Sequence, residues 1–135
     1  MSGSYSIYDL IGKSGSDLAC ARSREEVARL VGASGGCGAD FIMFLTDEEL
    51  RVVDAWKLLR EGDGIQRFPV SLAIRLALRA GAAGMIIVQE RNDPVPRRPD
   101  IELTQRLNQA LSETGTKLLD HLLIAGKTVS PCRTR

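Results

Sequence analysis

The sequence predicts a single α/β domain in which a mixed sheet is flanked by helices. The chain has 135 residues, a usual size for one domain. From Asp40 onward, short apolar runs typical of strands alternate with segments of helical periodicity. We expect residues 1–38 to form an N-terminal segment with one short helix and a glycine-rich linker, and residues 39–135 to form the domain.

The N-terminal segment contains one predicted helix, from about Arg24 to Val31. Ser23 and Glu26 fit a capping box, in which the Ser23 hydroxyl accepts from the amide of Glu26 and the glutamate reaches back to the amide of Ser23. Gly32 suits the end of this helix. Its apolar side chains, expected to be buried, are Val27, Leu30 and Val31.

Two strands and a helix follow. FIMFLT (41–46) and LRVVDAWKLL (50–59) are predicted to be strands joined by a short acidic turn. Pro69 opens a predicted helix that reaches about Ala80, with an apolar face and arginines on the opposite side.

The C-terminal half continues the alternation. GMIIV (84–88) is a continuous apolar run, as expected for a strand buried on both faces. After a polar loop, Pro99 opens a helix that reaches Thr114. KLLDHLLIAG (117–126) and KTVS (127–130) are the predicted closing strands.

Charge and cysteine content limit the class of protein. Lys and Arg number 18 against 17 Asp and Glu, and this balance gives no overall signal for nucleic acid or membrane. The N-terminus lacks the apolar core of a signal peptide, and the longest apolar stretch, residues 80–88, is too short for a membrane span. Three cysteines without CxxC spacing are typical of reduced thiols. We expect a cytoplasmic protein without membrane association.

The single histidine, His121, restricts metal and nucleophile chemistry. A hydrolytic zinc generally uses three protein ligands and an open position for water. Four zinc ligands could come from His121, Cys20, Cys37 and Cys132, but the separations between them in the sequence match no compact zinc site. Asp120 should point to the opposite face of the strand, which argues against a catalytic pair. We therefore expect no metal and no cofactor, and interpret His121 as a core residue bonded to a neighbour.

Two GK[ST] triplets, residues 12–14 and 126–128, do not predict nucleotide binding. A phosphate-binding loop needs a further glycine five residues before the one in the triplet. Those positions hold Ile7 and His121.

The loop before the last helix is chemically unusual because three arginines fall within it: Arg91, Arg97 and Arg98. Guanidinium groups beside free helix amides suit a phosphate or carboxylate. The acids Glu90, Asp93 and Asp100 partly cancel the local charge, and Asp100 can also stabilise the helix dipole. The loop is a candidate anion site, against the simpler interpretation of a solvated charged loop.

Two segments together resemble the RadC family of JAB/MPN domains: DPVPRRPDIELTQRL (93–107) and KLLDHLLIAG (117–126). In that family a strand leads into an HxHPSGDPxPSxxD loop, then a helix, then an LLDH-containing strand. The resemblance spans roughly residues 40–130. It implies a JAB/MPN-like (cytidine-deaminase-like) α/β fold with a mixed sheet flanked by helices.

The resemblance also implies where a zinc site would lie. The family uses two histidines and the loop's final aspartate as ligands, with a glutamate as general base and a serine that assists. The histidine positions fall on Gln89 and Arg91. The serine position falls on Arg97 and the glutamate position near Trp56, and only Asp100 is kept. Neither replacement is a good zinc ligand, and arginine brings a fixed positive charge to the position of the cation.

Three functions remain open from the sequence. We expect a catalytically inactive RadC-like domain that acts as an interaction or scaffold module, with an unknown protein partner or as a homodimer. The alternative is anion or nucleic-acid binding through the arginine loop, although an aromatic content of 4% counts against base stacking. The third is residual metal-dependent hydrolysis with ligands from a second chain. The family's DNA-repair label is not carried over, because its usual N-terminal helical region does not fit the first 40 residues.

Overall fold

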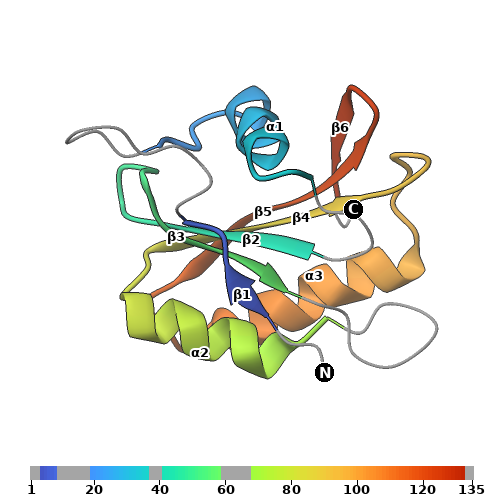
Figure 1. The fold of residues 1–135 in the computed structure, drawn as a ribbon. Coiled ribbons are helices and arrows are strands. Elements are labelled where there is room, and N and C mark those ends of the chain that lie inside the picture. The colour runs from blue at the N-terminus through green and yellow to red at the C-terminus, as the bar shows by residue number, and fades with distance from the viewer. Residues whose placement is uncertain (1–3, 9–18, 37–40, 59–67, 133–135) are drawn as a thin grey trace.

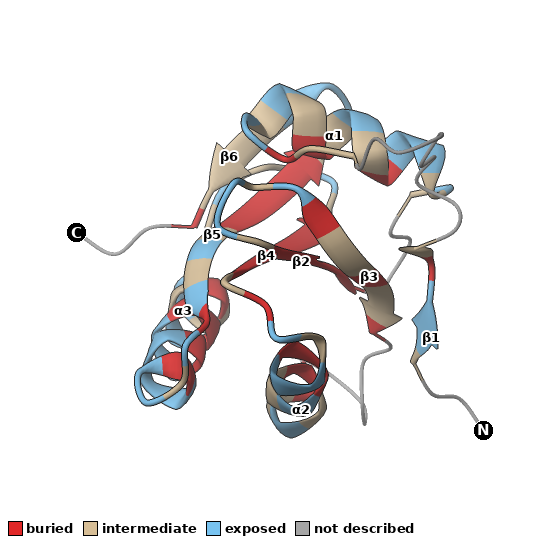
Figure 2. Ribbon diagram, turned by 90° about the vertical axis from the view of Figure 1, so that its left-hand side faces the viewer, coloured by how far each residue is buried: buried red, intermediate tan, exposed pale blue. Residues whose placement is uncertain are grey.

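The computed structural model describes residues 4–8, 19–36, 41–58 and 68–132 (Figure 1). Its elements follow in the order β1 (Tyr5–Ser6), α1 (Arg24–Ala33), β2 (Phe41–Thr46), β3 (Val52–Leu58), α2 (Val70–Ala80), β4 (Gly84–Glu90), α3 (Arg98–Leu111), β5 (Lys117–Ala125) and β6 (Thr128–Pro131). The strands form one mixed sheet, with α1 on one face and α2 and α3 on the other (Figure 2). The predicted fold class is confirmed.

The sheet has the strand order β1-β3-β2-β4-β5-β6. Neighbouring strands are antiparallel except β4 and β5, which are parallel. A parallel pair needs a crossover connection, and α3 provides it. The loop of residues 91–97 therefore leaves the carboxyl end of β4 and enters the N-terminus of α3, a position where open α/β sheets commonly bind ligands.

Helices on both faces explain why the central strands are buried throughout. All six residues of β2 are inaccessible, and β4 is buried up to Gln89, as predicted from its apolar run. Side chains alternate along β2: Ile42 and Phe44 pack with α1, whereas Phe41 and Met43 pack with α2 and α3. Among the described residues, no helix is both long enough and apolar enough to cross a membrane.

The N-terminal elements differ in part from the prediction. β1, in a segment where no strand was expected, pairs with β3. The Ser23 hydroxyl accepts from the amide of Glu26 at 3.1 Å as predicted, but the Glu26 carboxylate accepts from the amide of Arg22 at 2.7 Å instead of that of Ser23. Leu30 is only half-buried, and α1 continues past Gly32 to Ala33.

The ends of α2 and α3 are also shifted. Pro69 is the N-cap of α2 and not its first helical residue. α3 begins one residue before Pro99, at Arg98, and ends at Leu111. It stops before Thr114 because the Thr114 hydroxyl donates to the carbonyl of Leu111 at 2.9 Å.

Some predictions fall wholly or partly outside the described residues, among them the triplet at 12–14, Cys37, the last residue of the predicted strand 50–59, and the domain boundary after residue 38. The boundary stays a prediction. Val27 and Val31 of α1 nevertheless pack into the same core as β2 and β4. The second triplet, 126–128, lies at the turn between β5 and β6, where a phosphate-binding loop is not found.

Candidate functional site

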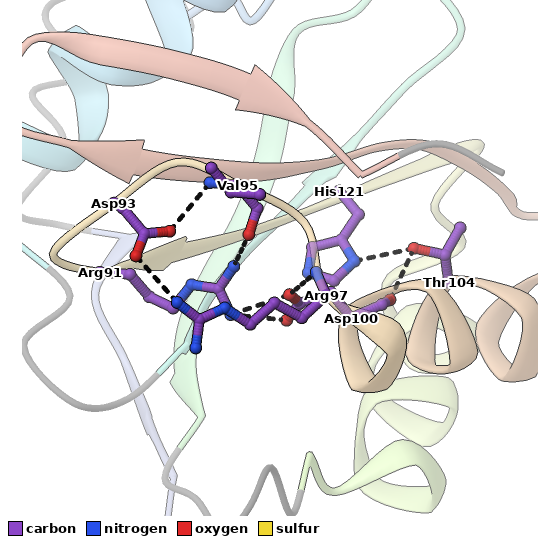
Figure 3. A network of polar contacts seen from close by, with 7 residues as sticks. All are labelled: Arg91, Asp93, Val95, Arg97, Asp100, Thr104 and His121. Carbon is purple, nitrogen blue, oxygen red and sulfur yellow. Dashed lines mark hydrogen bonds and ion pairs between the residues drawn. The ribbon is translucent and has the colours of Figure 1, made fainter.

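The loop between β4 and α3 brings together three of the five positions that the resemblance assigns to a zinc site. Arg91 and Arg97 lie on the loop, and Asp100 lies in the first turn of α3 (Figure 3). Gln89 is buried on β4, two residues before Arg91, with Phe41 and Leu123 as its neighbours across the sheet. The fifth position, Trp56, lies elsewhere.

Arg91 and Asp100 form a buried ion pair. The Nη1 atom of Arg91 lies 2.8 Å from Oδ2 and 3.0 Å from Oδ1 of Asp100 (Figure 3). The Asp100 side chain is 1% exposed and that of Arg91 is 19% exposed. Burial removes both charged groups from water, so either charge left without its partner would lower the stability of the fold. The pair therefore fixes the loop against the helix.

A ring of further hydrogen bonds holds the rest of the loop. Arg91 Nη2 donates to the carbonyl of Val95 at 2.7 Å, and the Val95 amide donates to Asp93 at 3.1 Å. Asp93 also accepts from Arg97 Nη2 at 2.9 Å. The Arg97 amide closes the ring by donating to Asp100 at 2.8 Å, which caps the N-terminus of α3.

His121 lies beside this network on β5, where it is 1% exposed. Its Nδ1 is 2.9 Å from the Thr104 hydroxyl, which donates its own proton to the carbonyl of Asp100 at 3.1 Å. When the single hydroxyl proton of Thr104 goes to Asp100, the contact requires the ring proton on Nδ1; Nε2 has no hydrogen-bond partner among the described residues. The interpretation of His121 as a core histidine bonded to a neighbour is confirmed.

The imidazole of His121 is neutral at pH 7. Burial lowers the pKa of His121 to about 4, and this effect outweighs the carboxylate of Asp100, which raises it. The positive charge of Arg91 lowers the pKa further. Cys132, whose amide donates to the carbonyl of His121 at 2.7 Å, is also buried, and burial raises the pKa of its thiol to about 12. Neither group is poised to act as an acid, a base or a nucleophile near neutral pH.

The side chains at the implied ligand positions do not suit a zinc ion. Gln89 offers only an amide, and Arg91 has no acceptor atom. The Arg91 guanidinium already contacts both oxygens of Asp100. Within the described parts of the chain, no three His, Cys, Asp or Glu side chains gather as a metal site would require.

Trp56 does not join the loop network. It lies on β3, and β2 separates β3 from β4. Its indole Nε1 donates to Asp54 at 2.9 Å, and its ring lines a groove beside α2.

The candidate anion-binding arginines each face a carboxylate. Arg91 pairs with Asp100, and Arg97 pairs with the half-exposed Asp93. Arg98 is 88% exposed and approaches Glu102 loosely, at 3.9 Å. The positive charge available to an external anion is reduced accordingly.

Sequence reasoning missed Thr104 and Val95. Thr104 follows Asp100 by one helical turn, so the spacing places both on the same face of α3 and could have indicated their contact. Val95 contributes only its backbone, for which the sequence carries no comparable signal.

Comparison with known proteins identifies the family of the chain. A family model described as "RadC-like JAB domain" matches residues 19–134. A UPF0758 protein of Desulforudis audaxviator is 48% identical over 50 residues, which cover 36% of this chain and 22% of that protein. A UPF0758 protein of Thermotoga maritima is 40% identical over 53 residues, covering 38% of this chain and 24% of the relative. The matched segment thus spans less than a quarter of each of these relatives.

Proposed function

The chain belongs to the RadC-like JAB domain family, and from that premise we propose that it is a catalytically inactive member that acts as a protein-interaction or scaffold module. The ion pair between Arg91 and Asp100 carries this proposal. Its guanidinium contacts the carboxylate that a zinc ion would need, 2.8 Å from the nearer oxygen.

The magnitude of the charge repulsion supports the proposal. A zinc ion bound to Asp100 would sit close to the fixed charge of Arg91. A unit charge and a divalent ion 4 Å apart repel by about 8 kcal/mol at an effective dielectric constant of about 20. Structural zinc sites gain roughly 10–16 kcal/mol with four good ligands. Asp100 alone cannot recover such a cost.

Anion or nucleic-acid binding by the loop is the less favoured function. The carboxylates of Asp93, Asp100 and Glu102 lie against the three arginines that would have to bind the anion. The proposal also includes a cytoplasmic location, supported by the buried thiol of Cys132, which forms no disulfide.

Zinc analysis of the purified chain tests the proposal. After incubation with Zn²⁺ and desalting, we expect the unmodified chain to retain far less than one zinc per molecule and to leave a mixture of test peptides uncut. The matched variant Gln89→His/Arg91→His puts imidazoles at the two histidine positions that the resemblance implies, and we expect it to retain about one zinc per chain. Stoichiometric zinc in the unmodified chain, together with peptidase activity that a chelator removes, would overturn the proposal.

A further inference from the structure

A groove runs between α2 and the β1–β3 edge of the sheet. It encloses about 340 Å³ and is lined by Ser4, Trp56, Leu72, Arg75, Leu76 and Arg79, which together define the α2 groove. Figures 1 and 2 show β1 and α2 close together at this edge. The volume is within the range of ligand pockets, about 300–1,000 Å³.

The floor of the α2 groove is apolar and partly open to solvent. Trp56 and Leu72 are half-buried and pack against the core beneath α2, whereas Leu76 is buried. The indole N–H of Trp56 donates to Asp54, so the polar atom of the ring is already satisfied. The exposed part of the ring is therefore available for apolar contact.

The rim of the α2 groove is positively charged. Arg75 and Arg79 lie one turn apart on α2 and are both exposed, and neither has an acidic partner in the described parts of the chain. α2 itself contains no acidic residue. Like charges at this spacing repel each other, so a carboxylate bound between them removes an unfavourable interaction. This distinguishes the groove from the β4–α3 loop, where the arginines face acids.

We propose that the α2 groove binds a short acidic peptide segment of a partner protein. An apolar side chain of the peptide seats against Trp56 and Leu72, and flanking carboxylates bind Arg75 and Arg79. This assignment rests on the interaction function proposed above and names its surface. Tryptophan and arginine are the residue types that most often dominate binding energy in such interfaces. A single-stranded nucleic acid, the other flexible polyanion, is less suited because the groove offers one aromatic ring for stacking.

Trp56 is the only tryptophan of the chain, so intrinsic fluorescence reports on the α2 groove directly. The full chain is titrated with eight-residue peptides whose two central residues are every combination of Leu, Ile, Val, Met and Phe, flanked by Asp and Glu. A matched set carries Lys in the flanks. We expect members of the acidic set to change the Trp56 emission saturably, with an affinity that weakens as salt is added.

Charge reversal supplies the decisive variants. Arg75→Glu/Arg79→Glu should weaken binding of the acidic peptides by about tenfold or more and make the lysine peptides bind instead. Leu72→Gln should weaken the acidic set without reversing the preference. Arg106→Glu makes one such charge reversal at an exposed position of α3 and should leave binding unchanged.

Three outcomes overturn the inference. One is the absence of an emission change with either peptide set, or an equal change with both. Another is a change that appears without peptide as the protein concentration rises, because this would identify a second copy of the chain as the occupant. The third is tighter binding of a single-stranded oligonucleotide than of any acidic peptide. Zinc-dependent hydrolysis would instead overturn the proposed inactivity while leaving peptide binding intact, so the two failures are distinguishable.

Discussion

The guanidinium of Arg91 lies 2.8 Å from the carboxylate of Asp100, and this contact ties the end of β4 to the first turn of α3 across the loop that joins them. The positive charge beside Asp100 is therefore supplied by a side chain of the protein, that of Arg91. Because both side chains are largely withdrawn from solvent, the contact should matter for stability as well as for the exclusion of a cation.

Arg91→Met should lower the free energy of unfolding by about 3–5 kcal/mol, because it leaves the Asp100 carboxylate buried without its partner. Urea denaturation at pH 7 measures this loss. Arg97→Met removes an ion pair of similar N–O distance whose partners are 63% and 45% exposed, and it should cost less than about 1 kcal/mol. Equal losses of unfolding free energy in the two variants would show that burial does not increase the contribution of the Arg91–Asp100 pair to stability.

The stability of the protein should fall between pH 7 and pH 5. The pKa of His121 is about 4 in the folded chain against an ordinary value of 6.5, so the unfolded chain binds a proton that the folded chain does not. Stability is therefore highest above pH 6.5 and is lost as the pH falls toward 4. These pKa values correspond to about 2 kcal/mol between pH 7 and pH 5.

Urea denaturation at the two pH values tests this prediction. His121→Gln removes the only imidazole and should largely abolish the difference, because most carboxylates titrate below this window. The same pH dependence in the variant would assign it to another group.

Thr104→Val should destabilise the fold by about 1–3 kcal/mol, because the buried Nδ1–H of His121 loses its acceptor. Nitrogen-15 NMR of the unmodified chain should show the neutral Nδ1–H tautomer. Thr104→Ser retains the hydroxyl and should keep this tautomer and most of the stability. An Nε2–H tautomer in the unmodified chain would contradict the hydrogen-bond order described above.

Gly84→Ala should cost about 1–3 kcal/mol by overpacking the start of β4. A methyl group at this position would lie 2.6 Å from Oγ1 of the fully buried Thr46 and also against the side chain of Leu119, so these side chains would have to move. Gly115→Ala is the matched control, because nothing lies within 4 Å of the added carbon. Thermal or urea denaturation compares the stabilities of the two variants. A Gly84→Ala variant as stable as the unmodified chain would show that β4 can move to accommodate the added methyl group.

The sequence predicted the central elements because their patterns reflect burial. Residues 41–46 and 84–88 are continuous apolar runs, and the structure buries each of them. Element ends were less predictable because individual hydrogen bonds decide them, as at Thr114. β1 consists of two residues whose pairing with β3 is a tertiary contact without a local pattern.

The resemblance named the positions of the candidate site, but the sequence did not indicate their contacts. The resemblance identified Arg91 and Asp100, yet their pairing depends on how the loop folds back across nine positions. The contact between Thr104 and His121 joins a helix to a strand and has no periodic signal. Trp56 was grouped with the loop through the resemblance, and the strand order instead separates it from Arg91.

Because β2 is completely buried, its side chains meet solvent only when the protein unfolds. Its sequence, FIMFLT, contains neither charge nor proline, which is the composition of segments that stack into amyloid-like fibrils. The two helical layers and the pairing of β2 with β3 and β4 keep this segment from meeting its counterpart on another molecule. Heating at high concentration should therefore end in precipitate instead of a recoverable unfolded chain, and each destabilising substitution should bring that temperature down.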